Sequence, residues 1–277
     1  MVVLVTGADG QLGQALQFIQ ADYPDLRLVF ANSQTGDITD AAKLEALFEA
    51  QKPQFCINAA AYTAVDKAEA EPEKAHNINV NGARNVAVSC RNHGVTLLHI
   101  STDFVFDGLK TTPYTELDHT NPTGVYGQTK RDGEIAVFAS TESAFVIRTS
   151  WVYSQFGNNF MKTMLRLASE RDKLSIVNDQ IGTPTHAVDL ARALISIIKS
   201  GNQNFGIYNF SNEGQCSWYE FASEIFNLND VPVNLTAIPT SAYPTPAKRP
   251  HYSVLDKSRI KNTFGLEIRD WKTALRN

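Results

Sequence analysis

Short apolar segments alternate with longer amphipathic segments through the first half of the chain. The apolar, β-branched segments have the length of strands and cover residues 1–6, 26–31, 54–59, 96–101 and 144–148. Between them, hydrophobic positions recur at helical spacing, first at Leu12, Leu16 and Ile19 and then across residues 41–50, 73–92 and 126–139. Strands that alternate with helices form a parallel sheet with helices on both faces. The pattern therefore predicts an α/β fold with a Rossmann-type, doubly wound parallel sheet.

The pattern loosens after Thr149. Here we expect a mixture of helices, short strands and a Pro-rich loop, over residues 159–170, 187–199 and 218–226 (helices), 174–177 and 208–211 (strands) and 238–250 (loop). No flexible linker separates this part from the first. The sequence thus predicts a main domain over residues 1–150 and a smaller lobe over residues 151–277, partly interleaved with the sheet.

Composition and charge narrow the class of function. The 277 residues carry a net charge of −4 without a basic block, which argues against a nucleic-acid partner. The three cysteines are widely spaced and the six histidines form no ligand-spaced cluster, so we expect free thiols and no metal site. No apolar stretch reaches about 20 residues, and no basic segment precedes the first strand. We therefore expect no membrane contact and a cytoplasmic location.

Three glycines follow the first predicted strand directly. Gly7 would allow a sharp turn, Gly10 would let backbone N–H groups approach a phosphate, and Gly13 would allow close packing of the first helix. A strand, a Gly-rich turn and a helix in this order are typical of a site for the pyrophosphate of a dinucleotide. Residues 1–150 are therefore the predicted dinucleotide-binding domain.

Tyr126 and Lys130 lie four residues apart in a predicted helix, and residues at this spacing share one helix face. A phenol on that face can donate a proton, and the neighbouring ammonium favours the phenolate and so lowers the pKa of the phenol. Combined with a dinucleotide site, the pair predicts that a nicotinamide cofactor reduces a carbonyl or oxidises an alcohol here.

Polar or small residues follow the ends of the predicted strands, and in an open parallel sheet these ends meet at the edge where ligands bind. Asn32 follows the second strand, and Asp37 is expected either to contact the adenine side of a cofactor or to act as a turn or helix-capping residue. Thr102 ends the fourth strand, where its hydroxyl is expected to hold the substrate carbonyl. Trp151 follows the fifth strand, where it could belong to the core or stack on a substrate.

Eight segments, two of them described above, carry a family resemblance: residues 7–13, 58–69, 101–108, 126–130, 148–153, 157–160, 178–185 and 243–250. On these segments the chain resembles the extended short-chain dehydrogenase/reductase superfamily and, within it, the dTDP-4-dehydrorhamnose reductases. The resemblance covers nearly the whole length. It implies reduction of dTDP-4-dehydro-β-L-rhamnose to dTDP-L-rhamnose by hydride transfer from NADPH or NADH, a step that supplies nucleotide sugar for cell-surface polysaccharides.

The resemblance also implies roles for individual positions. Thr102, Tyr126 and Lys130 would form the catalytic set. The cofactor would be lined by Gly7, Gly10, Gln11, Leu12, Gly13, Asn32, Asp37, Ile38, Ala61, Tyr62, Thr63, Tyr126 and Lys130. The dTDP-linked substrate would be held by Thr102, Asp103, Trp151, Gln180 and Arg249, which makes residues 151–277 the expected substrate-binding lobe.

One departure concerns assembly. Some members of the family bridge two subunits with magnesium, held by a glutamate of the first helix. Here the matching position is Ala15 and the chain ends at Asn277. This argues against a role for Mg²⁺ and against a metal-bridged dimer, and we expect a monomer or a homodimer.

Alternative functions stay open. Another nucleotide-sugar 4-ketoreductase, an epimerase or a dehydratase of the same superfamily would keep the fold. Dehydratases resemble one another in placing Asp-Glu after the strand-end Thr, whereas Phe104 follows Asp103 here. A regulatory subunit resembling the β subunit of methionine adenosyltransferase would use the fold to bind a partner, and the intact Thr102, Tyr126 and Lys130 argue against it.

The choice of cofactor depends on the end of the second strand. NAD-selective sites usually place a carboxylate there, which grips the ribose 2′-hydroxyl. This chain has Ala31, Asn32 and Ser33, with neither a carboxylate nor an arginine. We therefore expect both cofactors to be used, with NADPH modestly favoured.

Overall fold

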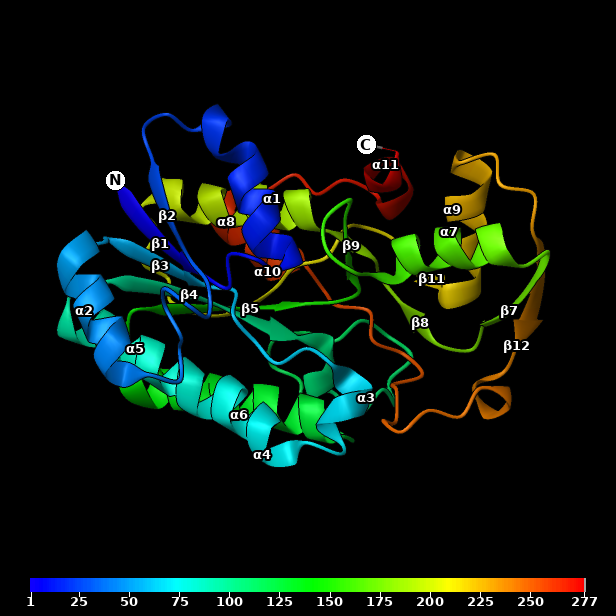
Figure 1. Cartoon of the computed structure of the whole chain (residues 1–277), viewed down its shortest axis with the longest axis horizontal. Coiled ribbons are helices and arrows are strands. Elements are labelled where there is room, and N and C mark those ends of the chain that lie inside the picture. The colour runs from blue at the N-terminus through cyan, green and yellow to red at the C-terminus, as the bar shows by residue number, and fades with distance from the viewer. Residues whose placement is uncertain (277) are drawn as a thin grey trace.

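The central sheet is built from the apolar segments that the sequence predicts as strands (Figure 1). A computed structural model of the chain describes residues 1–276, and within them the largest sheet has six parallel strands in the order β10-β5-β4-β3-β1-β2. These strands are β1 (Val2–Thr6), β2 (Arg27–Ala31), β3 (Phe55–Asn58), β4 (Thr96–Thr102), β5 (Ala144–Thr149) and β10 (Gly206–Asn209). The predicted α/β fold with a parallel sheet is confirmed.

Helices cover both faces of this sheet (Figure 1). One face is covered by α1 (Gln11–Ile19), α8 (Ala187–Ser200) and α10 (Ser258–Phe264), and the other by α2 (Ala41–Gln51), α5 (Ala83–Asn92) and α6 (Val125–Ser140). Along β1, Val3 and Val5 belong to the core between the sheet and α1, α8 and α10. Leu4 belongs to the core on the opposite face, under α2, α5 and α6. Because successive side chains point to opposite faces and both faces are buried, the strand is apolar throughout.

The segment predicted as one helix over residues 73–92 contains a π-helical turn. α4 (Pro72–His76) and α5 are joined by η2 (Asn77–Gly82). Asn79 in this turn is buried; its Oδ1 accepts a hydrogen bond from the N–H of Tyr62 (2.8 Å), and its Nδ2 donates to the carbonyl of Tyr62 (3.1 Å) and to Oγ1 of Thr129 (3.0 Å). The turn therefore fixes the segment that follows β3 against α6.

Short strands and two helices form the smaller lobe at one end of the molecule (Figure 1). It contains α7 (Phe160–Glu170), α9 (Trp218–Leu228) and the strand pairs β7 (Lys173–Val177) with β12 (Asn234–Ile238) and β8 (Ile181–Gly182) with β11 (Cys216–Ser217). In a further pair, β6 (Val152–Tyr153), which follows β5 in the chain, lies beside β9 (Thr185–His186), which precedes α8. The chain returns to the main sheet at α8, β10 and α10, so the boundary near residue 150 stays a prediction.

The remaining elements are short: η1 (Gln20–Asp22), α3 (Val65–Ala68), η3 (Asp103–Val105), η4 (Thr240–Ala242) and α11 (Trp271–Leu275). Among residues 1–276, no helix combines the length and the apolarity needed to cross a bilayer.

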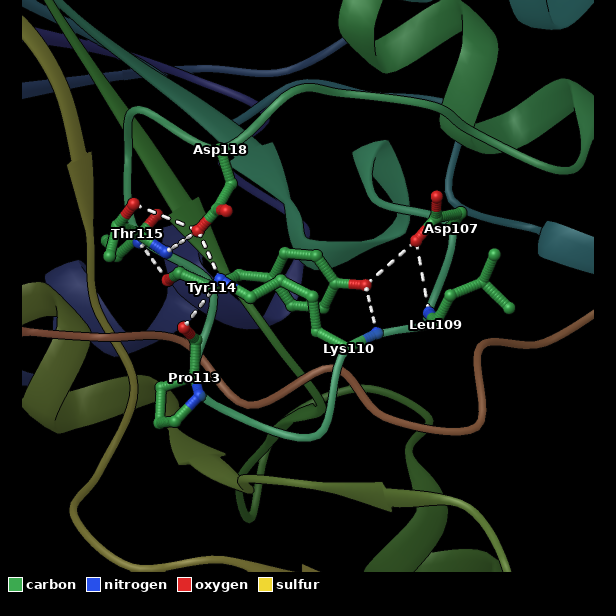
Figure 2. Close-up of polar contacts among 8 residues, drawn as sticks. Asp107, Leu109, Lys110, Pro113, Tyr114, Thr115 and Asp118 are labelled. Carbon is green, nitrogen blue, oxygen red and sulfur yellow. Dashed lines mark hydrogen bonds and ion pairs between the residues drawn. The ribbon is translucent and has the colours of Figure 1, made fainter.

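The loop between η3 and α6 is braced by its own side chains, as Figure 2 shows. The phenol of Tyr114 donates to Oδ1 of Asp107 (2.9 Å) and accepts from the N–H of Lys110 (3.2 Å). Oδ2 of Asp118 accepts from Nζ of Lys110 (2.7 Å) and from both the N–H and the hydroxyl of Thr115 (2.7 and 2.9 Å). These bonds hold the chain in one path between the end of β4 and the start of α6.

Candidate active site

The C-terminal ends of β1 to β5 open into one cleft of about 940 Å³. β2 lies on one side of β1 and β3 on the other, so the order of strands reverses at this point, where open parallel sheets bind ligands. The residues that follow each of these five strands line the cleft, together with residues from α6, the small lobe and the Pro-rich loop. The structure therefore brings together the strand ends that the sequence singled out.

The Gly-rich turn after β1 leaves no room for larger side chains. Gly7 has φ +73°, and a Cβ there would lie 2.6 Å from the backbone nitrogen of Ala60. A Cβ on Gly13 would lie 2.5 Å from the carbonyl oxygen of Ala8. Gly10 stands at the N-cap of α1 without a side-chain cap, so the first N–H groups of the helix are available to an anion in the cleft. This cradle fits the pyrophosphate of a dinucleotide.

Thr102, Tyr126 and Lys130 all line this cleft. Thr102 is the last residue of β4, and its hydroxyl donates to Oδ1 of Asp103 (3.0 Å). Tyr126 and Lys130 lie in the first two turns of α6, and the edge of the Phe104 ring packs on Tyr126 with centroids 5.5 Å apart. The ammonium of Lys130 is buried and donates to the carbonyl of Ile100 (2.7 Å).

Burial dominates the protonation of this set. It raises the pKa of Tyr126 to about 12, with a smaller contribution from the charge of Asp103, while a hydrogen bond with Thr102 opposes the rise. Burial lowers the pKa of Lys130 to about 8, and the charge of Glu134 opposes the fall. The sequence predicts a lowered pKa for Tyr126 beside Lys130, whereas the net change is a rise, because desolvation of the phenolate outweighs the contributions that favour it.

Asp103 is buried at the same edge of the cleft. Burial raises its pKa to about 6, and hydrogen bonds from Ser253 and Thr102 lower it. Its second oxygen, Oδ2, has no hydrogen-bond partner among the described residues. Asp103 thus lines the cleft with a buried carboxylate, and its contact with a sugar stays a prediction.

Trp151 follows β5 with a positive φ of 45°, and its ring stacks on Trp218 of α9 with centroids 3.4 Å apart and an interplanar angle of 9°. Both rings line the cleft. Trp218 is missing from the predicted site because it comes from the small lobe, and nothing in the sequence indicates its pairing with Trp151.

The predicted cofactor residues take different positions. Most of them line the cleft: Gly7, Gly10, Gln11, Leu12, Asn32, Asp37, Ile38, Ala61, Thr63, Tyr126 and Lys130. Gly13 shapes the turn instead, and the phenol of Tyr62 donates to Glu71 (2.9 Å) outside the cleft.

Three of these side chains also hold the protein together. Gln11 donates to the carbonyl of Val152 (3.2 Å) and accepts from Asn159 (2.9 Å), so it ties the Gly-rich turn to the segment before α7. Asn32 accepts from the N–H of Gln34 (3.0 Å) in the turn after β2. Asp37 accepts from the N–H of Thr39 (2.9 Å), which matches the expectation of a turn residue and leaves its second oxygen for a ligand.

The two predicted nucleotide contacts differ in position. Arg249 lines the cleft, and its guanidinium binds both carboxylate oxygens of Asp66 (3.0 and 2.7 Å). Gln180 does not line the cleft; its Nε2 donates to Oγ1 of Thr240 (3.1 Å). The sequence did not indicate that Asp66 is the ion-pair partner of Arg249.

Metal ligands do not gather anywhere in residues 1–276, where no group of three or more His, Cys, Asp or Glu side chains could hold an ion. Ala15, which matches the position of the magnesium-binding glutamate in some family members, is buried in α1 against the sheet.

Several known proteins that are similar to this chain share one name. Residues 1–277 match the family described as the RmlD substrate binding domain. A dTDP-4-dehydrorhamnose reductase of Aggregatibacter actinomycetemcomitans is 42% identical over 99% of this chain and 97% of its own length. Among solved structures, a dTDP-4-dehydrorhamnose reductase from Clostridium acetobutylicum has a TM-score of 0.95 and 42% identity, covering 100% of this chain and 97% of that chain. A dTDP-4-dehydrorhamnose reductase from Bacillus anthracis, in complex with NADP, has a TM-score of 0.94 and 39% identity, covering 99% and 96%.

Proposed function

The chain belongs to the RmlD family of dTDP-4-dehydrorhamnose reductases, and from this premise we propose that it reduces the 4-keto group of dTDP-4-dehydro-β-L-rhamnose. The product is dTDP-L-rhamnose, and NADPH or NADH is the reductant. The protein is thus an NAD(P)H-dependent oxidoreductase of dTDP-rhamnose biosynthesis.

One observation carries the proposal. Thr102, Tyr126 and Lys130 line the same cleft as the Gly-rich turn, in a chain whose relatives with this name match it over its whole length. The turn supports binding of a dinucleotide, and the three side chains support proton transfer to a neighbouring oxygen. A binding module without catalysis has no need for this combination.

The residues of the cleft can divide the chemistry between them. When bound, the nicotinamide supplies the hydride for C4 of the sugar. Tyr126 donates the proton that the developing alkoxide takes up, and its high pKa keeps the phenol protonated at neutral pH. Thr102 interacts with both Asp103 and Tyr126, so a carbonyl oxygen that approaches Tyr126 also meets the Thr102 hydroxyl. Lys130 holds a positive charge on the same helix face and favours the phenolate that remains.

The contacts of the substrate follow from the other walls of the cleft. Asp103 lines the cleft, where we expect it to meet the sugar, and the stacked rings of Trp151 and Trp218 offer an apolar wall. Arg249 also lines the cleft and is suited to bind a diphosphate, because a guanidinium can bind two phosphate oxygens at once.

The end of β2 supports the use of both cofactors. Asn32 and Ser33 line the cleft there, and no carboxylate follows Ala31 directly to repel a 2′-phosphate. Lys130 and Arg249 are the only cations among the described residues of the cleft, so the preference for NADPH should be modest.

The dehydratase alternative lacks its second carboxylate. The residue after Asp103 is Phe104, whose ring packs on Tyr126 and cannot take or give a proton. A reductase needs no such group. The three cysteines are free and buried, which supports the proposed cytoplasmic location.

A coupled assay tests the proposal. The protein is incubated with freshly made dTDP-4-keto-6-deoxyglucose, a 3,5-epimerase and NADPH, and the product is identified by mass spectrometry and NMR. We expect NADPH consumption that needs the epimerase and gives dTDP-L-rhamnose. A different sugar product, or consumption that does not need the epimerase, would assign the chain to another 4-ketoreductase. Absence of turnover, with a partner enzyme co-purifying, would favour the regulatory alternative.

A further inference from the structure

A buried ion pair lies beside the candidate catalytic set. Glu134 is one helical turn after Lys130 on α6, so Tyr126, Lys130 and Glu134 share one helix face. Arg148 of β5 donates from Nε to Oε1 of Glu134 (2.9 Å) and from Nη2 to Oε2 (2.7 Å). The side chains are 5% and 3% exposed. The proposed chemistry uses neither charge.

The carboxylate of Glu134 joins the three elements that carry the site. Its Oε1 also accepts a hydrogen bond from the hydroxyl of Ser101 (2.5 Å). Ser101 directly precedes Thr102 at the end of β4, and Arg148 directly precedes Thr149 at the end of β5. One side chain of α6 therefore fixes the helix against both strand ends.

The charge of Glu134 acts on Lys130. Tyr126 and Glu134 share the helix face of Lys130, and His99 of β4 interacts with its charge, while Arg148 is paired with Glu134. Burial and the charge of Lys130 hold the pKa of His99 well below its usual value, so the imidazole is neutral. Among residues 1–276, Glu134 is thus the anion that acts on Lys130, and it opposes the lowering of the Lys130 pKa by burial.

We propose that Glu134 is a positioning residue that acts through Lys130. It holds α6 against the ends of β4 and β5, and its negative charge keeps the buried ammonium protonated. The importance of Lys130 for turnover rests on the proposed function, whereas the effect of Glu134 on its charge is a property of the ligand-free protein.

Two substitutions that break the same ion pair separate charge from structure. Glu134→Gln removes the anion and keeps an oxygen for Ser101, and it leaves Arg148 as an unpaired cation nearby. Arg148→Met removes the cation and leaves Glu134. The first variant should lower the pKa of Lys130 by about one unit or more, the size expected when a close opposite charge is lost. The second should leave this pKa unchanged or raise it.

The first readout is the pKa of Lys130, measured without substrate or cofactor. The rate of acetylation of Lys130 by acetic anhydride is followed against pH by mass spectrometry of the peptide that contains it. The second readout is the pH profile of kcat/KM for the sugar nucleotide, whose basic limb should move toward acid in Glu134→Gln. For a shift of one unit from a pKa of about 8, activity at pH 8 should fall about fivefold more than activity at pH 6.

Asp189→Asn is the matched control. It breaks a second, partly buried pair, between Asp189 of α8 and Arg269 (2.6 Å), and should lower stability without moving the midpoint for Lys130. If Glu134→Gln does not fold, the double variant with Arg148→Met removes both buried charges, and such replacements are often tolerated. Its midpoint should also lie below that of the wild type.

Equal shifts in Glu134→Gln and Arg148→Met, or no shift in either, would overturn the proposal and leave the pair a structural one. The acetylation readout needs no substrate. The protein could fail the coupled assay while the pKa of Lys130 falls in Glu134→Gln and does not fall in Arg148→Met. This result would contradict the proposed function and support the present inference.

Discussion

Exchanging Asp66 for Asn and Arg249 for Ala should change the KM for the sugar nucleotide in opposite directions. The guanidinium of Arg249 binds Asp66 through two hydrogen bonds of 3.0 and 2.7 Å. The proposed contact with a diphosphate needs the same guanidinium. The substrate must therefore compete with Asp66 for Arg249.

The exposure of the pair sets the size of each effect. The side chain of Asp66 is 40% exposed and that of Arg249 25%, so water screens their attraction. Ion pairs of this kind contribute about 0.2–1 kcal/mol. Asp66→Asn should therefore lower KM by at most about fivefold. Arg249→Ala removes a charged hydrogen-bond partner of the substrate, which costs about 1.5–3 kcal/mol, and should raise KM about tenfold to over a hundredfold.

The assay is the initial rate of NADPH consumption at varied sugar nucleotide, with NADPH binding followed by fluorescence as a control. Asn at position 66 keeps an oxygen for the N–H of Ala247 (3.2 Å), so the anchor of the Pro-rich loop should survive. NADPH affinity should stay the same in both variants. A KM that rises in Asp66→Asn as it does in Arg249→Ala would show that the pair only clamps the loop, and that Arg249 does not bind the diphosphate.

Three further outcomes are expected. Tyr126→Phe should lower kcat by on the order of 10²–10⁴ without loss of NADPH affinity, because only the general acid is removed; near-normal turnover of the folded variant would contradict the assignment. Asp103→Asn should raise stability at pH 7 by up to about 3 kcal/mol, because burial raises the pKa from 3.8 to about 6, so that wild-type stability falls as pH rises from about 4 to 6. The unfolding midpoints of the two proteins in urea should converge below pH 4, and a constant difference would refute the titration of Asp103. Both NADPH and NADH should support turnover, with NADPH modestly favoured, and strict dependence on NADH in steady-state kinetics would refute our interpretation of Asn32.

Most of the main sheet could be predicted because its central strands are buried on both faces and are therefore largely apolar. In the small lobe the strand β7 was predicted, but β6, β8, β9 and β11 could not be, since they have only two residues each and no periodicity. The π-helical turn also escaped prediction, because Asn79 is held there by Tyr62 and Thr129 from other elements. Residues 73–92 alone give only a helical pattern.

The site shows a similar division. The spacing of Tyr126 and Lys130 and the glycines after β1 are local patterns that are visible in the sequence, and the structure places these residues along one cleft or in the turn that shapes it. Trp218 and Asp66 enter the site from distant parts of the chain, so only the packed structure reveals them. Glu134 is intermediate: its spacing from Lys130 is visible in the sequence, but its pairing with Arg148 depends on the order of the strands.

The protonation of the ligand-free site suits reduction more than oxidation. A pKa near 12 keeps Tyr126 protonated at neutral pH, so the proton that reduction consumes is present when a ketone arrives. Donating this proton leaves a phenolate in a buried site near the carboxylate of Asp103, which is unfavourable. Lys130 shares a helix face with Tyr126 and can offset this cost, but only while it is charged, and burial alone works against that charge. Tyr126 and Glu134 are therefore linked through Lys130: the burial that protects the proton on Tyr126 creates the need for an anion behind Lys130.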